Sequence, residues 1–128
     1  MKRSKLLLGP LQKRVLYWAT VLLWLTGAGW LVRPAPLWLK IHGAAAIAFL
    51  LVFGTLLDQH IPAGLRQEEE RPSGVWLAIL CGLLVLTGWG LYYFGNEALR
   101  QWTSRLHWAV GLVLPVLLFL HVKFRKNL

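Results

Sequence analysis

Four histidines are the residues of this chain best suited to chemistry, and they fall into two pairs. His42 and His60 are 18 residues apart, and His107 and His121 are 14 residues apart, each pair within or at the edge of an apolar run. At 100° per residue both members of a pair lie on one helix face, separated by roughly 27 Å and 21 Å along the axis. Imidazole is a common metal ligand, and ionisable groups inside apolar helices usually serve a function. The spacing therefore predicts two levels of metal ligation, each with two imidazoles.

Glycines accompany the first histidine of each pair, His42 and His107, which we call the upper histidines. The pattern Leu-Thr-Gly-x-Gly occurs twice, ahead of His42 and ahead of His107, and we expect its glycines to lie at the same depth as these histidines. These are Gly27, Gly29, Gly88 and Gly90. Glycine lets a flat cofactor approach the backbone closely. Small residues also simply allow helices to pack, but that alternative does not explain why the histidines are level with them.

The residue types narrow the cofactor to a b-type haem. Met1 is the only methionine, and no Cys-x-x-Cys-His occurs, so a methionine ligand and covalent c-type attachment are both disfavoured. Bis-histidine ligation of haem b remains. The sequence predicts an outer haem between His42 and His107 and a second haem between His60 and His121.

Two basic residues stand beside the outer ligands. Lys40 and Arg105 each precede a histidine by two residues. There they could contact haem propionates at the non-cytoplasmic face of the membrane. Snorkelling of a long cationic side chain to the interface explains them equally well.

These residues need membrane helices to position them. The 128 residues are 57% hydrophobic and 15% charged, too apolar for a soluble domain of this length. Four stretches of about 20 residues could each cross a bilayer, at roughly 15–32, 37–57, 75–94 and 102–122. We predict a single all-α transmembrane domain over residues 1–128. Its repeated Thr-Gly and basic-aliphatic-His motifs indicate two tandem helical hairpins in a four-helix bundle.

The net charge of +9 is explained by membrane topology without a nucleic-acid partner. Ten of the 14 basic residues fall on one side of the predicted spans, in the two terminal segments and the joint between the hairpins. By the positive-inside rule both termini and this joint lie in the cytoplasm. Cys81 is the only cysteine, so no internal disulfide is expected.

Most of the chain resembles a known family. The pattern Leu106-His107-Trp108-x-x-Gly111 through His121, with Thr-Gly motifs on the preceding helices, is similar to the small four-helix membrane cytochromes b. These include the cytochrome b561-like group and the b-type subunits of hydrogenases and formate dehydrogenases. The resemblance implies an integral protein of the bacterial inner membrane that transfers electrons between a redox partner subunit and the quinone pool.

The resemblance also bears on individual residues. His42, His107 and His121 match the family pattern as haem ligands, whereas His60 departs from it in spacing. No catalytic residue is implied, because such a subunit works within an oxidoreductase complex.

Three alternatives remain open. The chain could be a single-haem cytochrome with a quinone site near His60, a small transporter or metal-handling protein using the histidines, or a scaffold subunit without a cofactor. Cation transport usually needs acidic groups within the bundle, and Asp58, at the membrane edge, is the only candidate. A reducible b-type absorption band would separate the cytochromes from the other two.

Overall fold

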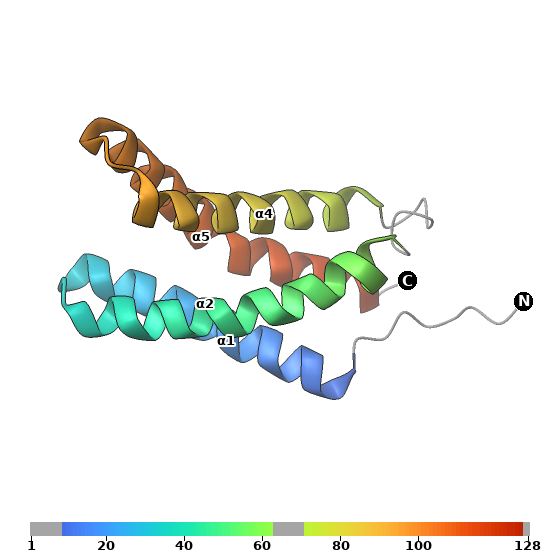
Figure 1. The fold of residues 1–128 in the computed structure, drawn as a ribbon. Helices are drawn as coiled ribbons and strands as arrows, with labels where there is room; N and C mark the ends of the chain where they lie inside the picture. Colours follow the sequence, from blue (N-terminus) through green and yellow to red (C-terminus); the bar gives the residue numbers. More distant parts are fainter. Residues whose placement is uncertain (1–8, 63–70, 127–128) are drawn as a thin grey trace, which may run out of the picture. The chain divides into compact units, whose positions relative to one another are not determined.

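The computed structural model describes residues 9–62 and 71–126, which are almost entirely helical. The long helices are α1 (Pro10–Val32), α2 (Pro36–Thr55), α4 (Arg71–Tyr93) and α5 (Glu97–Lys126), and the π-helical turn η1 (Leu56–His60) follows α2 (Figure 1). Four helices are long and apolar enough to cross a membrane, and the described part contains no strand. The predictions of an all-α fold and of four membrane-spanning helices are confirmed to this extent.

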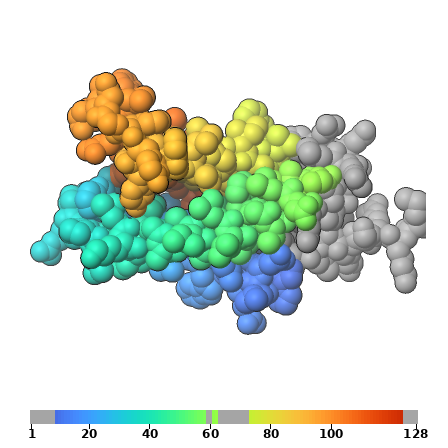
Figure 2. Space-filling model, in the orientation of Figure 1, coloured from blue at the N-terminus to red at the C-terminus, as the bar shows by residue number. Residues whose placement is uncertain are grey.

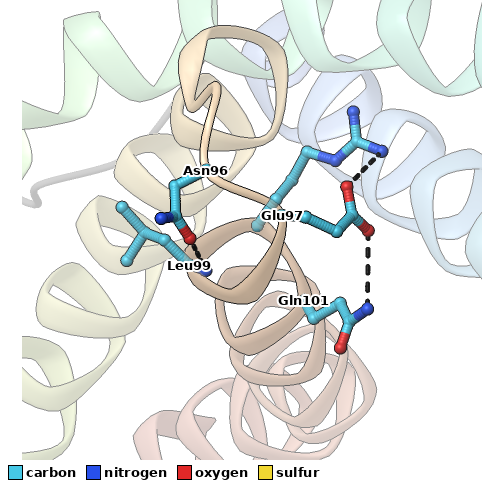
Figure 3. Close-up of polar contacts among 5 residues, drawn as sticks. Asn96, Glu97, Leu99 and Gln101 are labelled. Atoms are coloured by element: carbon cyan, nitrogen blue, oxygen red, sulfur yellow. Dashed lines mark hydrogen bonds and ion pairs between the residues drawn. The ribbon is translucent and has the colours of Figure 1, made fainter.

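The helices extend beyond the apolar runs that predicted them. α1 begins at Pro10 rather than near residue 15, because proline suits the first helical position and the Gly9 N–H donates to Gln12 Oε1 at 2.9 Å. α5 begins at Glu97 rather than near residue 102. There the Leu99 N–H donates to Asn96 Oδ1 at 2.9 Å, which caps the helix (Figure 3). Polar capping residues lie outside a hydropathy window, so hydropathy alone places the helix starts too late.

The first turn of α5 is held by exposed polar contacts. The Glu97 carboxylate lies 3.2 Å from the Arg100 guanidinium and accepts a hydrogen bond from Gln101 Nε2 at 3.5 Å (Figure 3). An acidic residue also suits the positive end of the helix dipole. Exposed ion pairs of this kind stabilise a helix by about 0–1 kcal/mol, so these contacts define the helix start more than they stabilise the fold.

The helices form two hairpins, each of which is a compact unit. α1 packs against α2 within Met1–Glu68, and α4 packs against α5 within Glu69–Leu128 (Figure 1). Closure of the hairpins into a four-helix bundle stays a prediction, as does the cytoplasmic placement of the termini. The topology prediction depends in part on Lys2, Arg3, Lys5 and Arg66, which lie outside the described residues.

Each hairpin has a small core along the line where its helices meet. In the first hairpin these residues are Leu16, Ala19, Thr20, Thr26, Ala45, Phe49, Val52 and Phe53; in the second they include Cys81, Thr87, Thr103 and Leu114. Most other large apolar side chains are exposed, for example that of Leu51 on α2, the helix drawn in teal to green in Figure 2. Apolar outer surfaces are expected where a helix contacts lipid rather than water.

Pro115 lies inside α5, yet the helix continues through it to Lys126. Proline has no N–H, so it removes the hydrogen bond that residue 115 would donate to the Gly111 carbonyl. Membrane-spanning helices tolerate such a local loss. Pro115 falls between His107 and His121, yet both histidines still make side-chain contacts with α4.

Candidate functional site

The first candidate ligand, His42, is held by a hydroxyl of the neighbouring helix. Thr26 Oγ1 on α1 lies 2.8 Å from His42 Nδ1 on α2, and it also lies 2.6 Å from the carbonyl oxygen of Leu22. A carbonyl can only accept, so the single hydroxyl proton of Thr26 is donated to Leu22. With its proton donated to Leu22, Thr26 Oγ1 acts as an acceptor, which favours a proton on His42 Nδ1. A neutral imidazole protonated at Nδ1 carries its lone pair on Nε2.

The second hairpin repeats this arrangement. Thr87 Oγ1 on α4 lies 2.8 Å from His107 Nδ1 on α5 and donates to the Leu83 carbonyl oxygen at 2.7 Å. The threonine and histidine are 16 residues apart in the first hairpin and 20 in the second, yet the distance is the same. The contact therefore follows from how the helices pack rather than from the length of the loop. The same arrangement favours a lone pair on Nε2 of His107.

A third contact of the same kind lies at the other end of the second hairpin. Ser73 Oγ, near the start of α4, lies 2.9 Å from His121 Nδ1, late in α5. Ser73 precedes Thr87 by 14 residues, as His107 precedes His121, so antiparallel helices bring both hydroxyl–histidine pairs into contact. The sequence motifs did not predict Ser73 as part of the site. This equal spacing was the available signal, but a serine at a helix start is ordinarily interpreted as part of the helix terminus.

A glycine follows each of these hydroxyl residues and faces the imidazole. A Cβ atom added to Gly27 would lie 3.8 Å from His42 Cε1, one added to Gly74 3.7 Å from His121 Cε1, and one added to Gly88 3.4 Å from His107 Cε1. We call this unit, a hydroxyl residue and a glycine against a histidine of the partner helix, the imidazole cradle. It occurs once in the first hairpin and twice in the second, among the described residues.

Gly29 and Gly90, also predicted to face haem, contact aromatic rings of their own hairpins. A Cβ on Gly29 would lie 3.0 Å from the Trp38 indole, and one on Gly90 would lie 2.5 Å from the Phe94 ring. The space that these glycines leave is therefore used by Trp38 and Phe94. In each Thr-Gly-x-Gly motif, the first glycine faces the imidazole and the second accommodates a ring.

The lower level of the first hairpin differs from that of the second. Leu56 lies 14 residues after His42, and Gln12 lies 14 residues before Thr26. The corresponding positions of the second hairpin are occupied by His121 and Ser73. Gln12 Nε2 donates to Thr55 Oγ1 at 3.1 Å, so this level holds an amide–hydroxyl contact.

His60 lies within η1, and its side chain is outside the described part of the structure. The Ile61 N–H donates to the Leu56 carbonyl, which is the i→i−5 pattern of a π turn. Such a turn adds one residue and so displaces later positions by about 100° around the axis. Residues 42–60 therefore do not form five regular α-helical turns, and a shared face of His42 and His60 stays a prediction.

The two predicted propionate partners, Lys40 and Arg105, are exposed. The Arg105 guanidinium carbon lies 5.0 Å from the centroid of the Trp102 ring, a cation–π contact within one turn of α5. This contact places the Arg105 charge close to the exposed Trp102 indole. Contact of either residue with a haem propionate stays a prediction.

The histidines are better suited to be axial ligands of a haem than to form a complete metal site from protein ligands alone. No group of three or more His, Cys, Asp or Glu side chains that could hold a metal ion occurs among the described residues. A structural zinc site takes four protein ligands and a catalytic one takes three. An imidazole on an apolar helix, with its lone pair on Nε2, is the kind of axial ligand that a b-type haem takes.

Comparison with protein-family models, with curated proteins and with solved structures finds no match to this chain. The residues that the structure describes are almost entirely helical, and four of their helices are long and apolar enough to span a membrane. The resemblance of the chain to the membrane cytochromes b stays a prediction.

Proposed function

We propose that this chain is the b-type cytochrome subunit of a membrane oxidoreductase. It would pass electrons between a redox partner protein and the quinone pool, with His42 and His107 as axial haem ligands. The observation that carries the proposal is the imidazole cradle, repeated in both hairpins. In each copy an imidazole on an apolar helix is held at 2.8 Å by a buried threonine, an arrangement that favours a lone pair on Nε2.

The side chains fit the requirements of a haem ligand. A histidine must be neutral to bind a metal, and a ligating histidine usually donates its other N–H to an oxygen that fixes the ring. Thr26 and Thr87 supply that oxygen. His42 and His107 are half-buried on apolar helices, and the nearby cations Lys40 and Arg105 are suited to haem carboxylates. A bound b-type haem would supply a reversible one-electron couple, whose potential depends on ligation, burial and hydrogen bonding.

The second haem is supported in one hairpin only. Ser73 and Gly74 form a cradle for His121 in the second hairpin. In the first hairpin the corresponding level has Leu56, Gln12 and Thr55, and the π turn changes the register of His60. These observations favour, as a second candidate, a single-haem cytochrome with a polar quinone site near His60 rather than the predicted di-haem form.

The remaining parts of the proposal concern partners and location. A haem subunit without substrate chemistry of its own requires an electron donor and an acceptor, which we propose to be a partner redox subunit and a membrane quinone. The apolar outer surfaces fit a lipid bilayer, and we place the protein in the bacterial inner membrane.

Absorption spectroscopy of the purified chain tests the proposal. The full chain, expressed in a haem-replete host and purified in detergent, should show a b-type band on reduction. His42→Ala or His107→Ala should abolish the haem held by that residue, whereas His60→Ala should leave it in place. Absence of a b-type band in the unaltered chain, or an unchanged spectrum in both alanine variants, would overturn the assignment.

A further inference from the structure

We propose that Thr26 and Thr87 are positioning residues that set the tautomer of the two candidate ligands, so that Nε2 rather than Nδ1 is the ligating nitrogen. The consequence for haem binding rests on the proposed function, whereas the tautomer itself is a property of each hairpin.

Proton counting within each cradle supports this role. In the opposite tautomer Nδ1 would be an acceptor, so the threonine would have to turn its proton away from the carbonyl of the preceding turn. That carbonyl is Leu22 O for Thr26, at 2.6 Å, and Leu83 O for Thr87, at 2.7 Å. A second carbonyl, Leu23 O at 3.1 Å, lies on the same side of Thr26. The hydroxyl proton is therefore held by the helix backbone, and the imidazole must supply the other proton.

Burial makes this preference strong. Only 3% of Thr26 and 7% of Thr87 is exposed, so water has little access to replace the hydroxyl. Threonine is also β-branched, which restricts its rotamers in a helix and favours those that place Oγ1 near the carbonyls of the preceding turn. The proton arrangement is thus fixed by the helix that carries the threonine, independently of the helix that carries the histidine.

Ser73 provides an internal comparison. It makes the same contact with His121 at 2.9 Å, but its side chain is exposed near the start of α4. Water can take the place of an exposed hydroxyl at little cost. We therefore expect Ser73→Ala to affect His121 less than Thr87→Val affects His107.

The tautomers can be measured directly by nitrogen NMR. The full chain would be labelled with ¹⁵N-histidine, expressed under haem limitation, purified in detergent and studied at a pH where the imidazoles are neutral. His42 and His107 should show the Nδ1–H form. Thr87→Val should change the His107 signals and leave those of His42 unaltered, which also reports that the variant is folded. Thr87→Ser, which keeps the hydroxyl, should restore the unaltered spectrum.

Haemin titration of the same variants tests the consequence for binding. Loss of a partner that orients a metal ligand typically lowers affinity 10–100-fold, so Thr87→Val should weaken haem binding by this factor and Thr87→Ser should not. An Nε2–H form of His42 and His107 in the unaltered chain would overturn the inference, whatever the haem content. Equal haem affinity of the valine and serine variants would overturn it too. The Nδ1–H form in a chain that binds no haemin would support the tautomer assignment and overturn the proposed function instead.

Discussion

At the scale of single residues, the chain builds its candidate site from hydroxyl oxygen, glycine and imidazole rather than from charge. A hydroxyl is a weaker acceptor than a carboxylate, and it brings no ionised group into an apolar helix, where a charge is costly. It still fixes the ring, because its own proton is used by the backbone. The two threonines therefore orient their histidines without an ion pair.

Substitutions of Gly88 should show how large a side chain can be accommodated next to the His107 imidazole. A Cβ at this position would lie 3.4 Å from His107 Cε1, which is an ordinary contact, so Gly88→Ala should bind haem nearly normally. Gly88→Leu would add three further carbons towards the ring, and overpacking of this kind costs about 1–3 kcal/mol. We expect loss of the haem held by His107 in the leucine variant only, measured as haem per chain. The same pair of substitutions at Gly27 should behave alike for His42, since its Cβ distance is 3.8 Å. Normal haem content in both leucine variants would contradict this account of the glycines.

At the scale of helices, each hairpin is an antiparallel pair, and the two pairs are similar in sequence. Their polar contacts fall at a regular spacing of 14 residues. In the second hairpin this spacing holds on α4 and on α5, across Pro115, and both cradles form. In the first hairpin the same spacing leads to Gln12 on α1 and to the end of α2, where η1 begins. The hairpins are therefore equivalent at the upper level and different at the lower one.

Two glycines of α4 should respond to alanine in opposite ways. Gly82 has no atom within 4 Å of an added Cβ, so Gly82→Ala should stabilise the helix by up to about 1 kcal/mol through higher helix propensity. At Gly90 the added Cβ would lie 2.5 Å from the Phe94 ring, which also packs edge-on against Trp89. Gly90→Ala should therefore lower the stability of the hairpin, by about 1–3 kcal/mol. Thermal unfolding in detergent measures both, and an equal gain in stability for the two variants would show that Phe94 moves away without cost.

At the scale of the whole molecule, four membrane-capable helices leave no segment for a soluble catalytic domain among the described residues. This fits a subunit that carries electrons for a partner, which is the function proposed above.

Haem stoichiometry decides between the two cytochrome forms. The prediction from the sequence is two haems per chain, with His60 and His121 as the ligands of the second. On that prediction His60→Ala and His121→Ala should each reduce two haems to one, measured as haem per protein in fully loaded, detergent-purified chain. One haem per chain, unchanged by His60→Ala, would rule the second haem out. It would favour the single-haem form that the π turn and the Gln12–Thr55 contact support.

The sequence by itself determined the helical class, the number and approximate extent of the membrane-capable segments and the repeated Thr-Gly motifs. These follow from local composition, since hydropathy over about 20 residues is a property of one segment. Only the tertiary structure decided which atoms meet across the helices of a hairpin. It brought Ser73 to His121, turned Gly29 and Gly90 towards Trp38 and Phe94, and interrupted the α-helical register before His60. Such contacts depend on the register between two packed helices and on a one-residue π turn, and neither is encoded in the composition of a single segment.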